Sequence, residues 1–196
     1  MEIRIKQYIA AELASAASVL GDAFVTNPTH VAAFGPQRLD QNRLFFRIGL
    51  ARMFTGCASV ALVDDELQGY AHFVPSPSCL PPPDQFEAAA EAFLKPLGDA
   101  VPRVVEWFSS WCRQDPAEPH VHLGPIGVSP KVQGKGVGTA LMNYYIDHLE
   151  TEATAGYLET NKPENVEFYQ KFGFVVRHEE EVIGTPNWYM WRPRPA

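Results

Sequence analysis

A glycine-rich segment, residues 133–139, has the residue types and spacing best suited to bind a charged ligand. It reads Gln-Gly-Lys-Gly-Val-Gly-Thr, with a glycine at every second position. Glycine reaches backbone conformations that other side chains forbid, so such a loop turns successive N–H groups toward one point and forms an anion nest. Apolar residues recur downstream with helical spacing, and a helix that begins at the loop adds its dipole to the attraction for an anion. The segment therefore predicts a phosphate site.

Several known phosphate loops can be compared with this segment. The P-loop pattern fails, because Ser129 stands where it needs glycine and Gly136 stands where it needs serine or threonine. The dinucleotide pattern needs glycine or alanine where Thr139 stands, although Glu159 lies about twenty residues on, as the ribose-binding acid of that fold does. A glycine-rich turn without any ligand stays open as a further alternative.

The elements on both sides of the loop follow from local patterns. Val121, Leu123, Ile126 and Val128 predict a strand, and the glycines within it indicate a bulge, which we place at Gly127 and Val128. Ser129 and the following proline end this strand. The helix after the loop is predicted to bury one face that consists of Val137, Leu141, Tyr144, Tyr145, His148 and Leu149.

Three linked motifs carry a resemblance to a known family. Residues 133–138 match the Q/R-x-x-G-x-G/A signature of the GNAT superfamily of N-acetyltransferases, and residues 126–130 (IGVSP) match the bulged fourth strand of that family. Residues 157–161 (YLETN) and 165–174 (NVEFYQKFGF) resemble its next strand and helix. The sequence of this half is most similar to the puromycin N-acetyltransferase-like branch. The resemblance implies acetyl-CoA as co-substrate, bound at Ile126, Gly127, Val128, Gln133, Gly134, Lys135, Gly136, Val137, Gly138, Thr139, Asn161, Asn165, Phe168 and Tyr169.

Acetyl transfer to an amine needs a base for the ammonium proton, an N–H donor for the oxyanion and an acid for the departing thiolate. The resemblance makes Tyr169 the acid, and the predicted bulge supplies the N–H donor. Glu159 is the first choice for the base, His122 the second and Glu106 the third. The expected function is acetylation of a primary amine of a small molecule by direct attack in a ternary complex. A protein or peptide N-acetyltransferase and a non-catalytic acyl-CoA sensor are the alternatives.

The acceptor site is expected between two early helices and an inserted region. Helices are predicted over residues 11–24 and 38–54, and in the resembled family they roof the acceptor pocket. Residues 75–118 are proline-rich and then helical, over 85–95 and 101–113, and exceed what the compact family pattern needs. Candidate acceptor contacts are Phe24, Asn27, His30, Phe34, Trp107, Phe108 and Trp111, with ordinary packing as the alternative for each.

Composition limits the remaining possibilities. The chain has 196 residues, so one domain over residues 1–196 is expected. The net charge of -7 makes a nucleic acid an unexpected partner, and no apolar run reaches the length of a membrane span. The three cysteines are widely spaced and odd in number, which favours reduced thiols in the cytoplasm and no metal site. Because the resembled family often dimerises through its C-terminal strands, a homodimer stays open beside a monomer.

The expected fold is an α/β (α+β) domain of the GNAT type. Its mixed, mostly antiparallel sheet has six to seven strands, is flanked by helices and splays between strands 4 and 5. The remaining strands are predicted over residues 2–8, 58–63, 67–74, 156–160, 174–177 and 188–191, the last two joined by a long connection. A helix is predicted over residues 163–172, with Asn161 as its N-cap and Glu164 completing a capping box.

Overall fold

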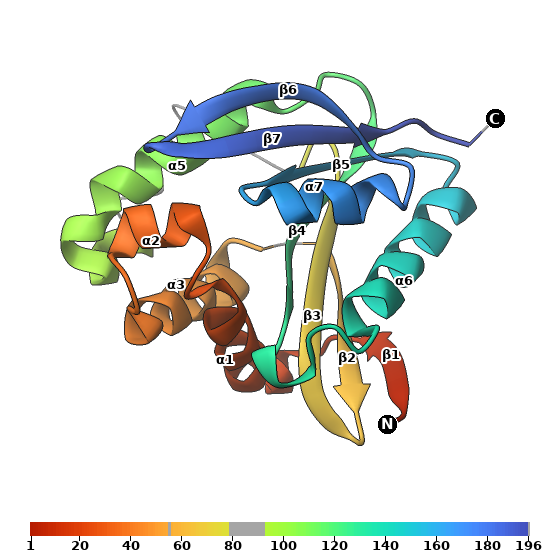
Figure 1. Ribbon diagram of the computed structural model, residues 1–196, viewed down its shortest axis with the longest axis horizontal. Helices are drawn as coiled ribbons and strands as arrows, with labels where there is room; N and C mark the ends of the chain where they lie inside the picture. Colours follow the sequence, from red (N-terminus) through yellow and green to blue (C-terminus); the bar gives the residue numbers. More distant parts are fainter. Residues whose placement is uncertain (55, 79–92, 196) are drawn as a thin grey trace.

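A single mixed sheet forms the centre of the computed structural model, which describes residues 1–54, 56–78 and 93–195 (Figure 1). Its seven strands in the described part of the chain lie in the order β1-β2-β3-β4-β5-β7-β6. Neighbouring strands are antiparallel except β4 and β5, which are parallel. The strands are β1 (Ile3–Gln7), β2 (Cys57–Val63), β3 (Glu66–Pro75), β4 (His120–Val128), β5 (Ala155–Thr160), β6 (Val175–Val182) and β7 (Thr185–Arg192).

Helices cover both faces of this sheet. Figure 1 shows α1, α2 and α3 on the side of the sheet away from α6. The helices are α1 (Leu13–Phe24), α2 (Pro28–Phe34), α3 (Leu39–Arg52), α5 (Val101–Gln114), α6 (Val137–Thr151) and α7 (Pro163–Gln170). Short 3-10 segments are η1 (Ala10–Glu12), η2 (Lys95–Ala100) and η3 (Pro130–Val132).

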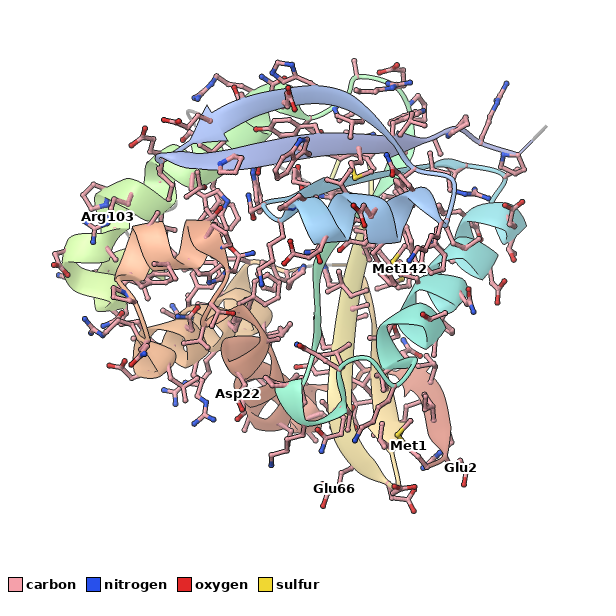
Figure 2. All side chains as sticks on the ribbon, in the orientation of Figure 1. Met1, Glu2, Asp22, Glu66, Arg103 and Met142 are labelled. Atoms are coloured by element: carbon pink, nitrogen blue, oxygen red, sulfur yellow. The ribbon has the colours of Figure 1, made fainter. Side chains whose placement is uncertain are left out.

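Alternation along β2 directs its side chains into two of the three apolar clusters found among the described residues. Val60 and Leu62 pack with residues of α1, α3 and α5, whereas Ala61 and Val63 pack with residues of α6. Successive side chains of a strand point to opposite faces, so a sheet covered on both sides buries every position. Met142 on α6 is fully buried in the second cluster (Figure 2). The site therefore lies on a sheet that is held from both faces.

The gap that positions the site lies between β4 and β5. These strands pair only from His120 to Leu123 on β4 and from Ala155 to Leu158 on β5. β4 then continues to Val128 beside β3, without β5 as a neighbour. The predicted GNAT-like fold, with its splay at this point, is confirmed.

The predicted bulge position on β4 is wrong by a few residues. Ile126, Gly127 and Val128 follow a regular register with β3, and the irregularity falls between Leu123 and Ile126. There two β4 residues, Gly124 and Pro125, oppose one β3 residue, which is the residue count of a bulge. Proline has no N–H to donate to a ladder, so the irregularity forms at the proline.

The C-terminal half contains two further corrections. The last two strands extend toward each other as a hairpin through Ile183 and Gly184, both with positive φ (45° and 77°), in place of the predicted long connection. α7 has Lys162 as its N-cap with no side-chain hydrogen bond, so the predicted cap at Asn161 and the capping box through Glu164 are wrong. The side chain of Asn161 instead donates to β7, as described below.

The helical predictions differ from the structure in smaller ways. The segment after α1 forms the extra helix α2, whose first turn is capped by Asn27 Oδ1, which accepts from Thr29 N at 3.0 Å and His30 N at 3.3 Å. Arg103 of α5 donates from Nε to the carbonyl of Ala33 at 2.8 Å and ties α5 to the end of α2 (Figure 2). On α6, Tyr144 is exposed rather than buried. The helix predicted over residues 85–95 lies mostly outside the described residues.

Candidate functional site

The glycine loop has the backbone geometry of an anion nest. Gly134 and Gly136 have φ of 73° and 88°, in the left-handed region, and α6 begins directly after them at Val137. Gly136 is the N-cap of α6 and provides no side-chain cap, so the first-turn N–H groups are not occupied by a capping side chain. Gln133 Nε2 donates to the carbonyl of Val128 at 2.9 Å and fixes the loop to the end of β4. Loop, strand end and helix start thus converge on one point.

Lys135 has an arrangement of its own in this loop. Its Nζ donates to the carbonyl of Lys131 at 3.2 Å and so serves the loop's own backbone. Beneath the loop, a Cβ on Gly138 would lie 3.7 Å from Phe168 and 3.8 Å from Val128. Phe168 of α7 therefore adjoins both the nest and the free end of β4.

The end of β4 turns two backbone N–H groups toward the gap. Ser129 N donates to the carbonyl of Gln68 on β3 at 2.8 Å, which sets the phase of the antiparallel ladder. Because hydrogen-bonded and non-bonded positions alternate, Gly127 faces β3, whereas the N–H groups of Ile126 and Val128 point toward the side that β5 has left. Gly127 is needed for another reason, since a Cβ there would lie 2.8 Å from the Leu20 side chain of α1. Of the two predicted donor positions, Val128 therefore keeps an N–H group that faces the gap, whereas Gly127 does not and Ile126 takes its place.

A pocket of about 260 Å³ opens beside this gap. Most of its lining is aromatic or aliphatic, and it joins the early helices, α5, the β4–β5 gap and α7. Its described lining residues are Phe24, Asn27, His30, Phe45, Phe46, Arg52, Met53, Phe54, His72, Val74, Phe93, Trp107, Phe108, Trp111, His122, Leu123, Gly124, Pro125, Ile126, Glu159, Thr160, Asn161, Asn165 and Tyr169.

The first two candidates for the base form one hydrogen-bonded pair. His122 Nε2 lies 2.7 Å from Glu159 Oε2, and both side chains are buried in the pocket lining. The second carboxylate oxygen of Glu159, Oε1, is buried with no hydrogen-bond partner in the described part of the chain. An unpaired buried carboxylate oxygen is costly, so it favours a ligand that brings an N–H group to it. The third candidate, Glu106, is exposed on α5 and does not line the pocket.

Tyr169 enters the pocket from the far side of the gap. Its ring packs against Phe168 and Phe174 with centroid distances of 5.4 and 6.3 Å. Burial raises the pKa of the Tyr169 hydroxyl above its usual value of 10, because the phenolate loses its hydration. The hydroxyl is therefore protonated at neutral pH and able to donate a hydrogen bond.

His30 lies at the centre of the aromatic end of the pocket. Its Nδ1 lies 2.7 Å from Asn42 Oδ1, while Asn42 Nδ2 donates to the carbonyl of Arg38 at 2.8 Å. Because the amide nitrogen of Asn42 serves a carbonyl, its oxygen must accept, so His30 carries its proton on Nδ1. Burial lowers the pKa of His30 to about 3, and the ring is neutral at working pH.

The sequence-predicted residues are mostly brought together. Phe24, Asn27, His30, Trp107, Phe108 and Trp111 line the same pocket as Glu159, Asn161, Asn165 and Tyr169. Phe34 does not line it and belongs to the adjoining core. Asn165 Nδ2 donates to Thr160 Oγ1 at 3.2 Å.

Sequence reasoning missed Asn42, His72 and Asn187. Asn42 stands three residues before the inward-facing Phe45, so its helical spacing could have revealed it. His72 Nδ1 donates to the carbonyl of Gly124 at the bulge, 2.8 Å away. Asn187 Oδ1 accepts from Asn161 Nδ2 at 2.7 Å and Trp111 Nε1 at 3.1 Å, which ties α5 and the residue directly after β5 to β7. No local pattern indicates the last two contacts.

The glycine loop, the N–H groups of Ile126 and Val128 and the His122–Glu159 pair lie around one gap, and the loop suits a phosphate-bearing ligand. Comparison with known proteins identifies the class further. The chain belongs to the acetyltransferase (GNAT) family, whose model matches residues 26–174. Such enzymes use acetyl-CoA, and a family member from Brucella melitensis has been solved with it (TM-score 0.56, 16% identity, 100% of this chain and 90% of that chain).

Two other proteins are similar to this chain, one in sequence and one in structure. Over 83 residues the chain is 35% identical to mycothiol acetyltransferase of Paenarthrobacter aurescens (strain TC1), a match that covers 39% of this chain and 25% of that protein. The chain thus spans a quarter of that curated relative. The structure of the histone acetyltransferase HPA2 and related acetyltransferase from Corynebacterium glutamicum ATCC 13032 has a TM-score of 0.76 at 23% identity, over 100% of this chain and 98% of that chain.

The described side chains hold no cluster of three or more histidine, cysteine, aspartate or glutamate residues that could bind a metal ion. Among the helices described here, none is long and apolar enough to cross a membrane.

Proposed function

We propose that this chain acetylates the primary amine of a small molecule by direct attack on acetyl-CoA within a ternary complex. The observation that carries the proposal is the pocket lining, which holds the Glu159–His122 pair and Tyr169 around one gap. A peptide acceptor is the less supported alternative, because the aromatic groups of α2, α3 and α5 line a pocket rather than an open groove.

Holding the cofactor is the task of the loop and of β4. The nest at Gly134 and Gly136 fits the pyrophosphate, since its N–H groups and the start of α6 attract an anion. The N–H groups of Ile126 and Val128 fit the amides of the pantetheine arm and the thioester carbonyl, in place of the pairing that β5 does not provide. Gln133, Lys135, Val137, Gly138, Thr139, Asn161, Asn165 and Phe168 complete the proposed cofactor contacts.

Glu159 removes the proton from the ammonium form of the acceptor. An amine attacks only as the neutral base, so its ammonium form must first lose a proton. Oε1 of Glu159 is the buried acceptor for that proton, and His122 at 2.7 Å from Oε2 orients the carboxylate. The amine nitrogen then forms the new N–C bond as the C–S bond breaks, and the second proton that the nitrogen loses replaces the one that Tyr169 gives to the departing sulfur.

The oxyanion and the leaving group have separate partners. A strand N–H on β4 stabilises the negative charge that develops on the carbonyl oxygen. Tyr169 donates its hydroxyl hydrogen toward the departing sulfur, because its raised pKa keeps it protonated. Proximity and orientation in the ternary complex account for much of the remaining decrease in activation free energy, about 7–11 kcal/mol in ideal cases.

The domain organisation, location and partners are proposed from the sequence. We propose one domain over residues 1–196 that works in the cytoplasm on small molecules, without nucleic acid or membrane partners, as a monomer or a homodimer. The motifs of residues 121–175 support a place near the puromycin N-acetyltransferase-like branch. That branch favours an antibiotic-like aminonucleoside as acceptor, and a size measurement in solution distinguishes the two oligomeric states.

The test is free-thiol release from acetyl-CoA with a panel of amines, on the natural protein and on Tyr169→Phe. Amine-dependent release that falls about 10²- to 10⁴-fold in kcat, with little change in the KM for acetyl-CoA, supports both the reaction and the acid. The substitution removes a single hydroxyl group, so the midpoint of thermal unfolding should stay close to that of the natural protein. This midpoint serves as the control. Tight acetyl-CoA binding without turnover for any amine would instead favour a sensor.

A further inference from the structure

The distal part of the pocket is built from aromatic rings packed around a neutral imidazole. The His30 ring lies 4.8 Å from Phe24, 5.4 Å from Phe46 and 4.9 Å from Trp107, centroid to centroid. Trp107 in turn contacts Trp111 at 5.2 Å in an edge-to-face arrangement. All five side chains line the pocket. We call them the aromatic box.

The box is rigid and uncharged. Asn42 holds His30 in one tautomer, as shown above, and Trp111 is held by its bond to Asn187 at 3.1 Å. Trp107 is buried, and its indole N–H has no hydrogen-bond partner among the described groups. A rigid apolar box selects for shape, because its rings gain most from another ring at an offset or perpendicular contact of 4.5–7 Å.

The charged residues of the pocket lining also favour an acceptor with a single amine. Among the lining residues that the structure describes, Glu159 is the one Asp or Glu and Arg52 the one Lys or Arg. Glu159 is paired with His122 and is assigned to the reacting amine. A second ammonium on the acceptor would therefore meet no further described carboxylate, and it would be repelled by the guanidinium of Arg52, which lies 5.8 Å from the Phe93 ring.

We propose that the pocket selects primary monoamines with an aromatic ring on a short aliphatic linker, and that Trp107 and Arg52 set this selectivity against diamines and polyamines. The inference rests on the proposed acetyl transfer and specifies its acceptor. The ring of the acceptor lies in the aromatic box, and its amine reaches Oε1 of Glu159 across the pocket. Recognition is thus of one flat apolar group and one amine.

Initial-rate measurements of thiol release test the proposal. Phenethylamine and tryptamine are compared with putrescine and spermidine, and hexylamine separates an aromatic requirement from mere apolarity. We expect kcat/KM for the arylalkylamines to exceed that of the diamines by at least 100-fold and that of hexylamine by at least tenfold. Equal or better turnover of putrescine overturns the inference and leaves acetyl transfer intact, whereas no thiol release with any amine refutes the proposed function itself.

Two variants locate the selectivity. Trp107→Leu should lower kcat/KM for phenethylamine at least tenfold and leave the KM for acetyl-CoA unchanged. Trp191→Leu is the matched control, because Trp191 is also buried but lies on β7 outside the pocket lining. Equal losses in both variants would mean a general packing effect and would overturn the assignment of Trp107.

Arg52→Glu tests the charge argument without cutting into the core, because Arg52 is exposed. We expect the ratio of putrescine to phenethylamine turnover, each as kcat/KM, to rise at least fivefold. High salt should shrink this change, since it screens exposed charges. An unchanged ratio would refute the role of Arg52 in excluding a second ammonium.

Discussion

The most direct test of the phosphate nest is Gly136→Val. Gly136 has φ of 88°, a conformation that costs a non-glycine residue about 1–3 kcal/mol and is least tolerated by a β-branched one. A Cβ at this position would have only Ile3 Cδ1 nearby, at 4.0 Å, so the effect is conformational rather than steric. The free loop is exposed and can relax out of the left-handed region, which breaks the convergence of its N–H groups.

The expected loss of affinity follows from this strain. Binding must return the relaxed loop to its original conformation, so the strain released in the free protein reappears as weaker binding. At about 1.4 kcal/mol for each factor of ten, 1–3 kcal/mol corresponds to a Kd for acetyl-CoA that rises about 5- to 150-fold. Calorimetry or competition with a fluorescent CoA analogue measures this Kd.

Two controls separate the nest from other effects. Gly184→Val places the same side chain at φ of 77°, in the open β6–β7 turn, and should cost stability without changing the Kd. Lys135→Ala should weaken binding less than Gly136→Val, because Lys135 already serves the carbonyl of Lys131. The reasoning is refuted if Lys135→Ala abolishes binding while Gly136→Val leaves the Kd unchanged.

Three further perturbations test the base, the loop anchor and the buried histidine. Glu159→Gln should lower kcat/KM about 10²- to 10⁴-fold, and the loss should shrink as pH approaches the pKa of the amine, where no base is needed; a loss independent of pH would contradict that role. Gln133→Ala should raise the KM for acetyl-CoA more than it changes kcat, because Gln133 fixes the loop to β4 at 2.9 Å; initial rates would contradict this if only kcat fell. The pKa of His30 is lowered to about 3 in the folded protein, so the unfolded chain binds more protons and stability falls as pH drops below 6.5. Between pH 6.5 and 5 this loss is about 1.6 kcal/mol, and urea unfolding should show it in the natural protein but not in His30→Phe.

Features encoded within short stretches could be predicted from the sequence. The glycine spacing of residues 133–139 determines the left-handed positions at Gly134 and Gly136, which depend on the absence of a side chain and little on the rest of the fold. The strand before the loop and the helix after it follow from local periodicity in the same way. Tyr169, which the family resemblance indicated, and Glu159, which was chosen for its place on the strand, line one pocket.

Features that depend on distant partners could not be predicted. The hydrogen bond between His122 and Glu159 joins two strands 37 residues apart, so the sequence could only rank them as rival bases. Asn161 has the composition of an N-cap, but its contact with Asn187 on β7 outweighs the local preference. The turn at Ile183 and Gly184 was missed because isoleucine is rarely found at positive φ, and here strand pairing on both sides enforces it.

The choice between direct attack and a covalent acetyl-enzyme can be argued from the pocket. A covalent route needs an activated nucleophile beside the base, and the cysteines that the structure describes, Cys57 and Cys112, are absent from the pocket lining. Burial, with the nearby charges of Asp115 and Glu159, raises the pKa of the Cys112 thiol to about 12, so it is not a thiolate at neutral pH. Instead, the hydrogen-bonded pair of Glu159 and His122 and the unpaired β4 N–H groups of Ile126 and Val128 lie around one gap, where two substrates can meet. This arrangement supports transfer in a single step, for which initial-rate patterns should intersect rather than run parallel.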